Sequence, residues 1–442
     1  MPPAFKMSMP SYVCLVQFDI CGWKDVCDGL YTHTCDVIIT IRPRSVQVRD
    51  TVNLEAASTR LDGFTIEIPS WGFANTGTRF GKFLQAGAAT TLEEKFADAA
   101  QVLALTGITS SLALHVLWDL PRGLDDVAEV KRLVEKYGVQ AGSINPNLFQ
   151  DQEYKFGSLC SPNAEVRHQS IEHVLRSIAI ARALGCRDIS LWLADGSNYP
   201  GVQSIRDRIA WLEEALAEIH AALADDQRLL IEYKPFEPAF YHTDIADWGM
   251  ASHLARNAGP KARVLVDTGH HYPSQNIEQI VAWLLHLDLL GGFHFNDRRY
   301  ADDDLTLGSI DPYQVFRIFH EILADPRDEF ANIAFMLDQS HNIKGKMEAT
   351  VQSVVAAQEL YAKACMVDRV RLAELQTATK TVEAEECLRS AFWSDVRPAL
   401  EEWRKGRGVP GNPLRALAET GYVARIERER ASRNTMLQSS YA

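Results

Sequence analysis

Apolar and polar residues follow two alternating patterns along most of this 442-residue chain. From about residue 60, short runs rich in apolar and β-branched residues end in polar ones, and each is followed by a longer segment with helical periodicity. The strand-like runs begin at Phe64, Leu112, Val139, Asp188, Leu229, Ala262, Gly291 and Ile333. Strands that alternate with helices in this way predict an α/β fold.

The spacing of these runs favours a closed barrel. Their starts lie 27 to 49 residues apart, which leaves room for one helix and its loops, as in the helical patterns of 206–223 and 277–290. No G-x-G-x-x-G or P-loop motif joins a predicted strand to a helix, so nothing indicates the nucleotide crevice of a doubly wound sheet. We therefore expect a (βα)8 TIM barrel over residues 59–365.

The two ends of the chain differ from this repeat. Residues 1–58 contain strand-like pieces with no place in it, and they form an N-terminal extension whose structure the pattern does not define. Residues 366–442 are charged and amphipathic, with helical runs at 367–375, 381–404 and 414–430. These runs predict a C-terminal helical extension that either packs on the barrel or forms oligomer contacts.

Polar side chains end four consecutive predicted strands, at the rim where the active site of a (βα)8 barrel forms. Glu232, Asp267, His294 and Asp338 each close an otherwise apolar run. Carboxylates that converge in a barrel mouth repel one another and are costly to desolvate unless a cation neutralises them. The pattern therefore predicts a metal site, and oxygen ligands with one imidazole and no cysteine suit Mn²⁺, Mg²⁺ or Co²⁺.

Two-residue spacing supports this geometry. Glu232 and Lys234 share one face of their strand, as do His294 and Asn296, whereas the two phenylalanines of the FHF motif take the opposite face. Lys234 is therefore expected beside the metal ligands.

A second set of possible ligands is less regular. His270 stands three residues after the strand-end aspartate in VDTGHH, and Asp302 and Asp304 lie in YADDDLT after the seventh strand. These residues could hold another cation. Alternatively, the two aspartates belong to a solvated acidic loop before a helix that is capped by Asp311 and begins with Pro312.

Three further residues are candidates for contact with a substrate, each with a structural alternative. Trp192 could form an apolar wall for the ring of a substrate or belong to the core. His115, four residues before Asp119, could be oriented by this aspartate or be a hydrogen-bonded structural histidine. Phe80, in the loop after the first strand, could cover the barrel mouth or be part of the scaffold.

Composition narrows the possible partners. Asp and Glu outnumber Lys and Arg by 58 to 45, so no overall positive field attracts nucleic acid. No apolar run approaches the roughly 20 residues of a membrane span, and the apolar N-terminal stretch lacks a secretory signal pattern. The eight cysteines form no C-x-x-C pair and indicate free thiols in a reducing compartment. We expect a cytoplasmic enzyme that acts on a small molecule.

Several motifs, in this order, resemble the L-rhamnose isomerases, in particular the broad-specificity bacterial branch that also handles D-allose. They are PSWG at Pro69, KFGSL at Lys155, DGSN at Asp195, EPAFY at Glu237, VDTGHH at Val266, GGFHFND at Gly291, YADDDL at Tyr300 and DQSHN at Asp338.

This resemblance implies a site with two divalent cations per subunit, Mn²⁺ foremost. Glu232, Asp267, His294 and Asp338 would hold a structural metal, and His270, Asp302 and Asp304 a catalytic one. Lys234, Trp192 and His115 would line the sugar site. The resemblance also implies a homotetramer in which Phe80 reaches into the neighbouring subunit's site.

The activity that it implies is the interconversion of L-rhamnose and L-rhamnulose, with relaxed specificity for related aldoses, by a metal-assisted 1,2-hydride shift that uses Lys234, Asp302 and His270. A path with Glu232 as carbon base is less favoured, because metal coordination lowers the basicity of a carboxylate. The alternatives are a ketose 3-epimerase of a related barrel and a catalytically inactive sugar-binding barrel.

Overall fold

The computed structural model describes residues 59–75, 83–196, 199–237, 241–300, 302–327, 329–341 and 343–435. The predicted N-terminal extension, residues 1–58, lies outside the described residues, as does Phe80.

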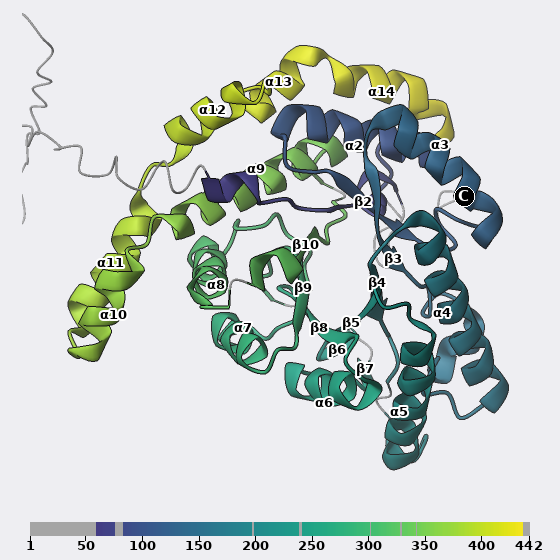
Figure 1. Ribbon diagram of the computed structural model, residues 1–442. Coiled ribbons are helices and arrows are strands. Elements are labelled where there is room, and N and C mark those ends of the chain that lie inside the picture. Colours follow the sequence, from purple (N-terminus) through teal and green to yellow (C-terminus); the bar gives the residue numbers. More distant parts are fainter. Residues whose placement is uncertain are drawn as a thin grey trace, which may run out of the picture. The chain divides into compact units, whose positions relative to one another are not determined.

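Eight parallel strands form one sheet, with each strand beside the next along the chain (Figure 1). They are β1 Ile68–Pro69, β2 Ser111–His115, β3 Gln140–Asn145, β4 Asp188–Trp192, β5 Arg228–Glu232, β8 Ala262–Asp267, β9 Leu290–Phe295 and β10 Ala334–Leu337. The backbone of Glu67 joins the two ends of the sheet, since its N–H donates to Phe335 O at 2.8 Å and its carbonyl accepts from Leu337 N at 2.9 Å. All eight predicted strands are present, and the predicted TIM barrel is confirmed.

Helices connect the strands and lie around them in Figure 1. They are α2 Leu92–Thr106, α3 Val127–Tyr137, α4 Ala164–Leu184, α5 Ile205–Ala222, α6 Trp248–Ala258, α7 Ile277–His286, α8 Pro312–Ala324 and α9 Lys346–Cys365. Local signals explain their limits: Asp311 caps α8 by accepting from Gln314 N, as predicted, and α2 ends at Gly107, whose φ of 74° suits glycine. A short hairpin, β6 Phe236–Glu237 and β7 Tyr241–His242, lies between β5 and α6.

The strand faces separate the apolar layer from the site. Phe293 and Phe295 stack with ring centroids 4.8 Å apart and pack against Phe335 and Phe319 between the strands and the helices. His294, between the two phenylalanines, therefore takes the opposite face, toward the barrel interior. This alternation is the one predicted from the FHF motif.

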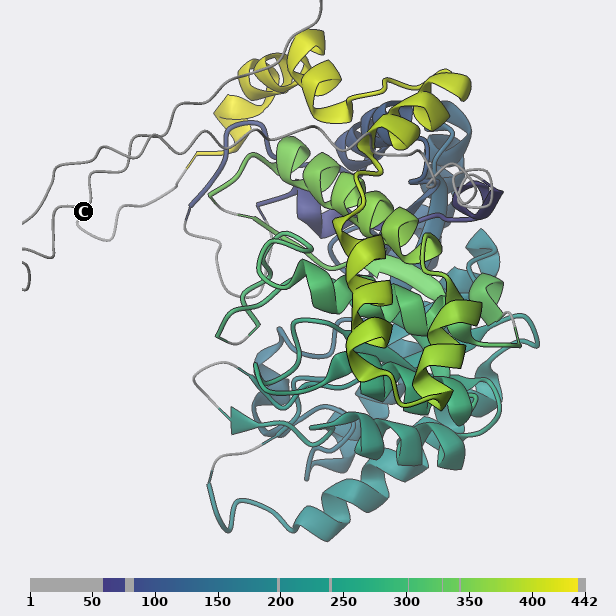
Figure 2. The same ribbon diagram turned by 90° about the vertical axis from the view of Figure 1, so that its left-hand side faces the viewer.

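The C-terminal helices lie outside the ring of barrel helices, coloured yellow-green to yellow in Figure 1 and Figure 2. They are α10 Arg369–Thr377, α11 Thr381–Trp393, α12 Arg397–Gly406, α13 Pro413–Thr420 and α14 Tyr422–Arg430. Two predicted runs are each divided. Ser394 adopts an extended conformation between α11 and α12, and Gly421 takes a left-handed one, φ 65°, between α13 and α14.

This extension packs on its own barrel. Helix α13 contacts α2 and α9, and the buried Arg430 of α14 pairs with Asp98 of α2 at 2.8 Å. Asn434 donates its side-chain amide to the carbonyls of Ala86 and Ala88 in the loop after β1. These contacts support the packing role predicted for the extension, whereas oligomer contacts remain a prediction. No described helix is long and apolar enough to cross a membrane.

Candidate metal centre

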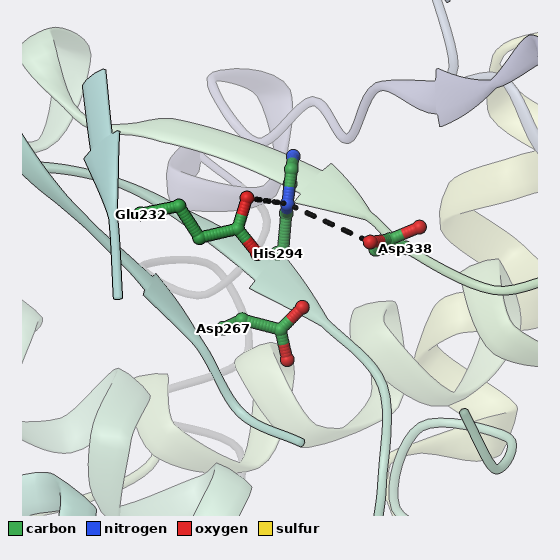
Figure 3. Close-up of side chains that lie close together, drawn as sticks. All are labelled: Glu232, Asp267, His294 and Asp338. Carbon is green, nitrogen blue, oxygen red and sulfur yellow. Dashed lines mark ion pairs between the residues drawn. The ribbon is translucent and has the colours of Figure 1, made fainter. Parts of the chain in front are cut away.

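Four neighbouring strands place Glu232, Asp267, His294 and Asp338 around one point (Figure 3). Glu232 ends β5, Asp267 ends β8, His294 lies near the end of β9, and Asp338 directly follows β10. One ligand atom of each residue lies within 4.8 Å of those of the other three. His294 Nδ1 is 3.2 Å from Glu232 Oε2 and 3.8 Å from Asp338 Oδ2. Parallel strands end at the same rim, so the side chains converge although the residues are far apart in sequence.

The unused atoms of this group suit a cation. Asp267 Oδ2 and His294 Nε2 are buried and have no hydrogen-bond partner among the described residues. A buried polar atom without a partner costs free energy, and a cation at the centre would remove that cost. Three carboxylates and one imidazole are the donors that Mn²⁺ or a similar divalent ion accepts.

The opposite atoms of the same groups are already bonded. Asp267 Oδ1 accepts from Gly269 N at 2.6 Å and from Asn296 Nδ2 at 3.0 Å, and Asp338 Oδ1 accepts from Trp71 Nε1 at 2.8 Å. These bonds hold both aspartate carboxylates so that the other oxygen of each faces the centre. The residues therefore fit a divalent cation.

When no cation is bound, the raised pKa values of His294 and Asp267 favour protons on these groups, and the protons offset the negative charge of the carboxylates. Burial lowers the pKa of His294, but the carboxylates of Glu232, Asp338 and Asp267 together outweigh burial and raise it to about 10. Burial raises the pKa of Asp267 to about 7. Burial also acts to raise the pKa of Glu232, but the positive charges of His294, His270 and Lys234 together outweigh burial and lower that pKa. Cation binding is therefore expected to displace protons from this group.

A second group shares Asp267 and adds His270 and Asp302. His270 Nε2 lies 3.7 Å from Asp267 Oδ2 and 3.5 Å from Asp302 Oδ2. The other ring nitrogen, Nδ1, lies 3.1 Å from the carbonyl oxygen of Tyr233, which favours its protonation and leaves Nε2 directed at the carboxylates. Two of the residues predicted for the second cation are thus brought together with a ligand of the first.

Asp304, the third residue predicted for the second cation, is not a member of this group in the described structure. Its backbone is left-handed, with φ 50°, a conformation that aspartate tolerates better than most residues. Its role as a ligand remains a prediction.

Gly269 allows the backbone to run close to both groups. A Cβ atom at this position would lie 2.6 Å from Asn296 Oδ1 and 3.1 Å from oxygens of Asp267 and Asp302. Only glycine fits between these side chains without displacing them.

Lys234 links the second group to the candidate sugar site. Its Nζ lies 2.8 Å from Asp302 Oδ2 and 5.0 Å from the ring centre of Trp192, and its side chain is 2% exposed. The predicted catalytic residues Lys234, Asp302 and His270 therefore stand side by side. A buried ammonium held by a carboxylate offers a fixed positive charge to a substrate oxygen.

An aromatic wall, formed by Trp71, His115, Trp118, Phe149 and Trp192, adjoins the cation groups. His115 stacks on Trp118 at 3.8 Å between ring centroids, and Phe149 contacts both His115 and Trp192 by its edge. Burial lowers the pKa of His115 to about 4, so this ring is neutral at pH 7. The wall joins two residues predicted to contact a sugar.

Three of these aromatic residues, Trp71, Trp118 and Phe149, were not singled out from the sequence. Each follows one of the first three strands by a few residues, which is the signal that could have identified them.

The predicted partnership of His115 with Asp119 takes a different form. Asp119 accepts from the backbone N–H of His115 at 2.8 Å, and also from Ser70 Oγ and Lys95 Nζ. The ring nitrogen Nδ1 of His115 instead bonds to the carbonyl of Val116. Asp119 therefore holds the backbone at the end of β2 and does not bond to the imidazole itself.

One further group of possible ligands, Cys160, Asp195 and Asp244, lies outside this site. Arg208 already pairs with Asp244 at 2.6 Å, and Asp195 accepts from Ser158 and from Cys160 N. Burial raises the pKa of the Cys160 thiol well above its usual range, so a thiolate ligand is disfavoured. This group is a structural network.

The fold and the two groups of ligands define a TIM barrel that carries a candidate divalent-cation site at the carboxyl ends of its strands. Residues 103–326 match the family model described as xylose isomerase-like TIM barrel, and the chain belongs to this family.

Relatives agree with this assignment. The chain is 39% identical over 387 residues to a probable sugar isomerase of Rhizobium meliloti, which covers 86% of this chain and 89% of that protein. It is 37% identical over 386 residues to a probable sugar isomerase of Mesorhizobium japonicum, covering 86% and 89%. The L-rhamnose isomerase of Bacteroides thetaiotaomicron is 26% identical over 231 residues, which covers 49% of this chain and 53% of that enzyme. The predicted resemblance is confirmed for the superfamily, and the named L-rhamnose isomerase is a more distant relative.

Proposed function

We propose that this protein is a metal-dependent aldose–ketose isomerase that interconverts L-rhamnose and L-rhamnulose and accepts related aldoses such as D-allose. The observation that carries this proposal is the pairing of Lys234 Nζ with Asp302 Oδ2 at 2.8 Å, beside two ligand groups that share Asp267. The two relatives described as probable sugar isomerases support the reaction class. The choice of L-rhamnose rests on the motif resemblance and on the more distant L-rhamnose isomerase.

Two divalent cations per subunit, with Mn²⁺ preferred, are part of this proposal. Glu232, Asp267, His294 and Asp338 would hold one, and His270 and Asp302, with Asp267, would hold the other. When bound, they would supply positive charge that stabilises the two sugar oxygens while hydrogen moves between C1 and C2.

The chain's own residues would orient the sugar and move protons between its oxygens. Lys234 would donate a hydrogen bond to O1, and Asp302 would hold the ammonium in place. The aromatic wall would cover the apolar face of the sugar and exclude water from the reacting carbons. These roles favour a hydride shift between C1 and C2.

The surroundings of Glu232 argue against an enediol path. Glu232 lies 3.2 Å from both His294 Nδ1 and His270 Nδ1, and it would be a ligand of the first cation, whose charge would stabilise the carboxylate. A carboxylate that is stabilised in this way is a weak base toward carbon.

A ketose 3-epimerase requires acidic groups on opposite faces of the reacting carbon. Glu232 is the sole glutamate in the two ligand groups of the described structure, and Lys234 faces the other group. The ammonium of Lys234, held by Asp302, would stabilise a sugar oxygen that gains negative charge, as isomerisation requires. An epimerase would instead need a second group that removes a carbon-bound proton.

One set of assays tests this function. The protein would be stripped with EDTA, reloaded with Mn²⁺, Co²⁺ or Mg²⁺, and assayed with L-rhamnose, L-mannose, L-lyxose and D-allose, and with a ketose for epimerisation at C3. We expect aldose–ketose conversion that EDTA abolishes and Mn²⁺ restores. Conversion limited to C3 would identify an epimerase, activity that survives complete metal removal would refute the metal-dependent mechanism, and cation binding without turnover of any sugar would favour an inactive binding barrel.

We also propose that the protein works as a cytoplasmic homotetramer in which Phe80 reaches a neighbouring subunit's site, as the motif resemblance implies. Light scattering gives the number of subunits. Complementation between Phe80→Ala and Lys234→Met subunits, mixed in one oligomer, would test whether Phe80 acts in the neighbour's site.

A further inference from the structure

The two ligand groups are supported in different ways. Every ligand of the first group lies in a strand or directly after one, whereas His270 and Asp302 lie on the loops that follow β8 and β9. Loops have more freedom than paired strands, so the separation of His270 and Asp302 depends on what joins these two loops.

The loop after β9 is firmly closed at its base. The backbones of Asp297 and Leu305 exchange hydrogen bonds at 2.9 and 2.8 Å, and the side chain of Asp297 accepts from Arg298 N, Ile310 N and Asp311 N. Arg298, which is 7% exposed, therefore starts from a fixed backbone.

The guanidinium of Arg298 binds the opposite loop. It donates from Nη1 to Thr268 O at 3.0 Å, from Nε to His271 O at 2.6 Å and from Nη2 to Tyr272 O at 3.1 Å. The Thr268–Tyr272 turn wraps around this one side chain, and His270 lies within it. A planar guanidinium has donors on three nitrogens in a rigid fork and so fixes carbonyl oxygens in set directions, whereas an ammonium carries its donors on one rotating nitrogen.

We infer that Arg298 is a positioning residue for the second cation: by holding the Thr268–Tyr272 turn against the loop that carries Asp302, it keeps His270 Nε2 facing Asp302. This inference rests on the proposed function only in assuming that the second group binds a cation. Partners that orient metal ligands typically change metal affinity by about 10- to 100-fold when they are replaced.

The test is Mn²⁺ binding to the full-length protein, measured by calorimetry and by bound-metal analysis. We expect two ions on the wild-type chain. In Arg298→Met, the first ion should bind as in wild type and the second about 10- to 100-fold more weakly. Arg298→Lys, which keeps the charge but reaches fewer carbonyls, should fall between the two. Thermal melting of each variant shows whether the fold is intact, and the Lys variant serves if the Met variant does not fold.

Arg404 provides a matched control. It is 4% exposed, donates to Gln358 Oε1 and to Gly411 O, and lies in the C-terminal extension. Burial lowers the pKa of both arginines. Arg404→Met should lower the melting temperature as Arg298→Met does, but leave both Mn²⁺ affinities unchanged.

The outcomes separate this inference from the proposed function. Equal affinity for the second ion in Arg298→Met and wild type would overturn the positioning role, and so would parallel weakening of both ions. A wild-type chain that binds two ions but converts no sugar would overturn the proposed function and leave the role of Arg298 standing. A wild-type chain that binds a single ion would overturn both.

Discussion

The two cation groups use the same chemical ligands on different supports. The hydrogen-bonded sheet itself aligns the first group: Asp267 pairs with His294 in register between β8 and β9, and Glu232 pairs with Leu265 of β8. The second group borrows Asp267 from the sheet and adds two loop residues that side-chain contacts hold in place. The strands therefore fix the positions of the first group directly, whereas the positions of His270 and Asp302 depend on the contacts of two loops.

Replacing the ligand that belongs to both groups should have the largest effect. Asp267→Asn removes one charge from each group, so we expect loss of both cations and a fall in turnover of about 10³-fold or more, since a bound metal supplies several kcal/mol of transition-state stabilisation. Bound-metal analysis and a rate measurement check this. Asp188→Asn, at the opposite end of the barrel and paired with Arg228, is the control that should retain both cations. Retention of both ions in Asp267→Asn would show that the shared ligand is misassigned.

Replacing a ligand that lies on a loop should affect one cation and not the other. Asp302→Asn is expected to weaken the second cation, keep the first, and lower turnover by about 10²- to 10³-fold, because it also removes the negative charge that pairs with Lys234. Asp303→Asn is a control in the same loop, since Asp303 accepts from Arg299 N and Tyr300 N, bonds that an asparagine can still accept. If Asp302→Asn lost both ions together, the two groups would be one site.

Lys234→Met should leave both cations bound and still lower kcat by about 10²-fold, because its charge acts on the substrate oxygen and not on the metals. The measurement is a comparison of kcat with Mn²⁺ affinity for the same preparation. Lys363→Met, a partly buried lysine in α9 that donates to Phe392 O, is the control. Unchanged kcat in Lys234→Met would remove this lysine from the mechanism.

The aromatic wall should give the smallest effect. Trp118→Ala removes the ring stacked on His115 and is expected to raise KM by about 5- to 10-fold with little change in kcat, as the loss of one aromatic contact implies. Exposed Trp393, replaced by Ala, is the control. A fall in kcat as large as the expected rise in KM would mean that the wall positions the reacting groups as well as binding the sugar.

Much of the first group could be predicted because it follows the strand repeat. Lys234 could be predicted for the same reason, since two residues along a strand return a side chain to the same face. The second group could not be derived in this way. Asp302 and Asp304 stand in the same acidic stretch and have the same chemistry, and the path of the loop places Asp302 in the group with Asp267 and His270.

The sequence alone therefore determined the eight-strand barrel and the convergence of Glu232, Asp267, His294 and Asp338 at its strand ends, because strand period and parallel topology leave little freedom in where those side chains lie. The tertiary structure decided what holds the loops. Arg298 binds backbone carbonyls, which every residue possesses, so its partners cannot be identified from their residue types. The same holds for Asp119, whose bond to the His115 backbone could not be distinguished from a bond to the ring until the loop was folded.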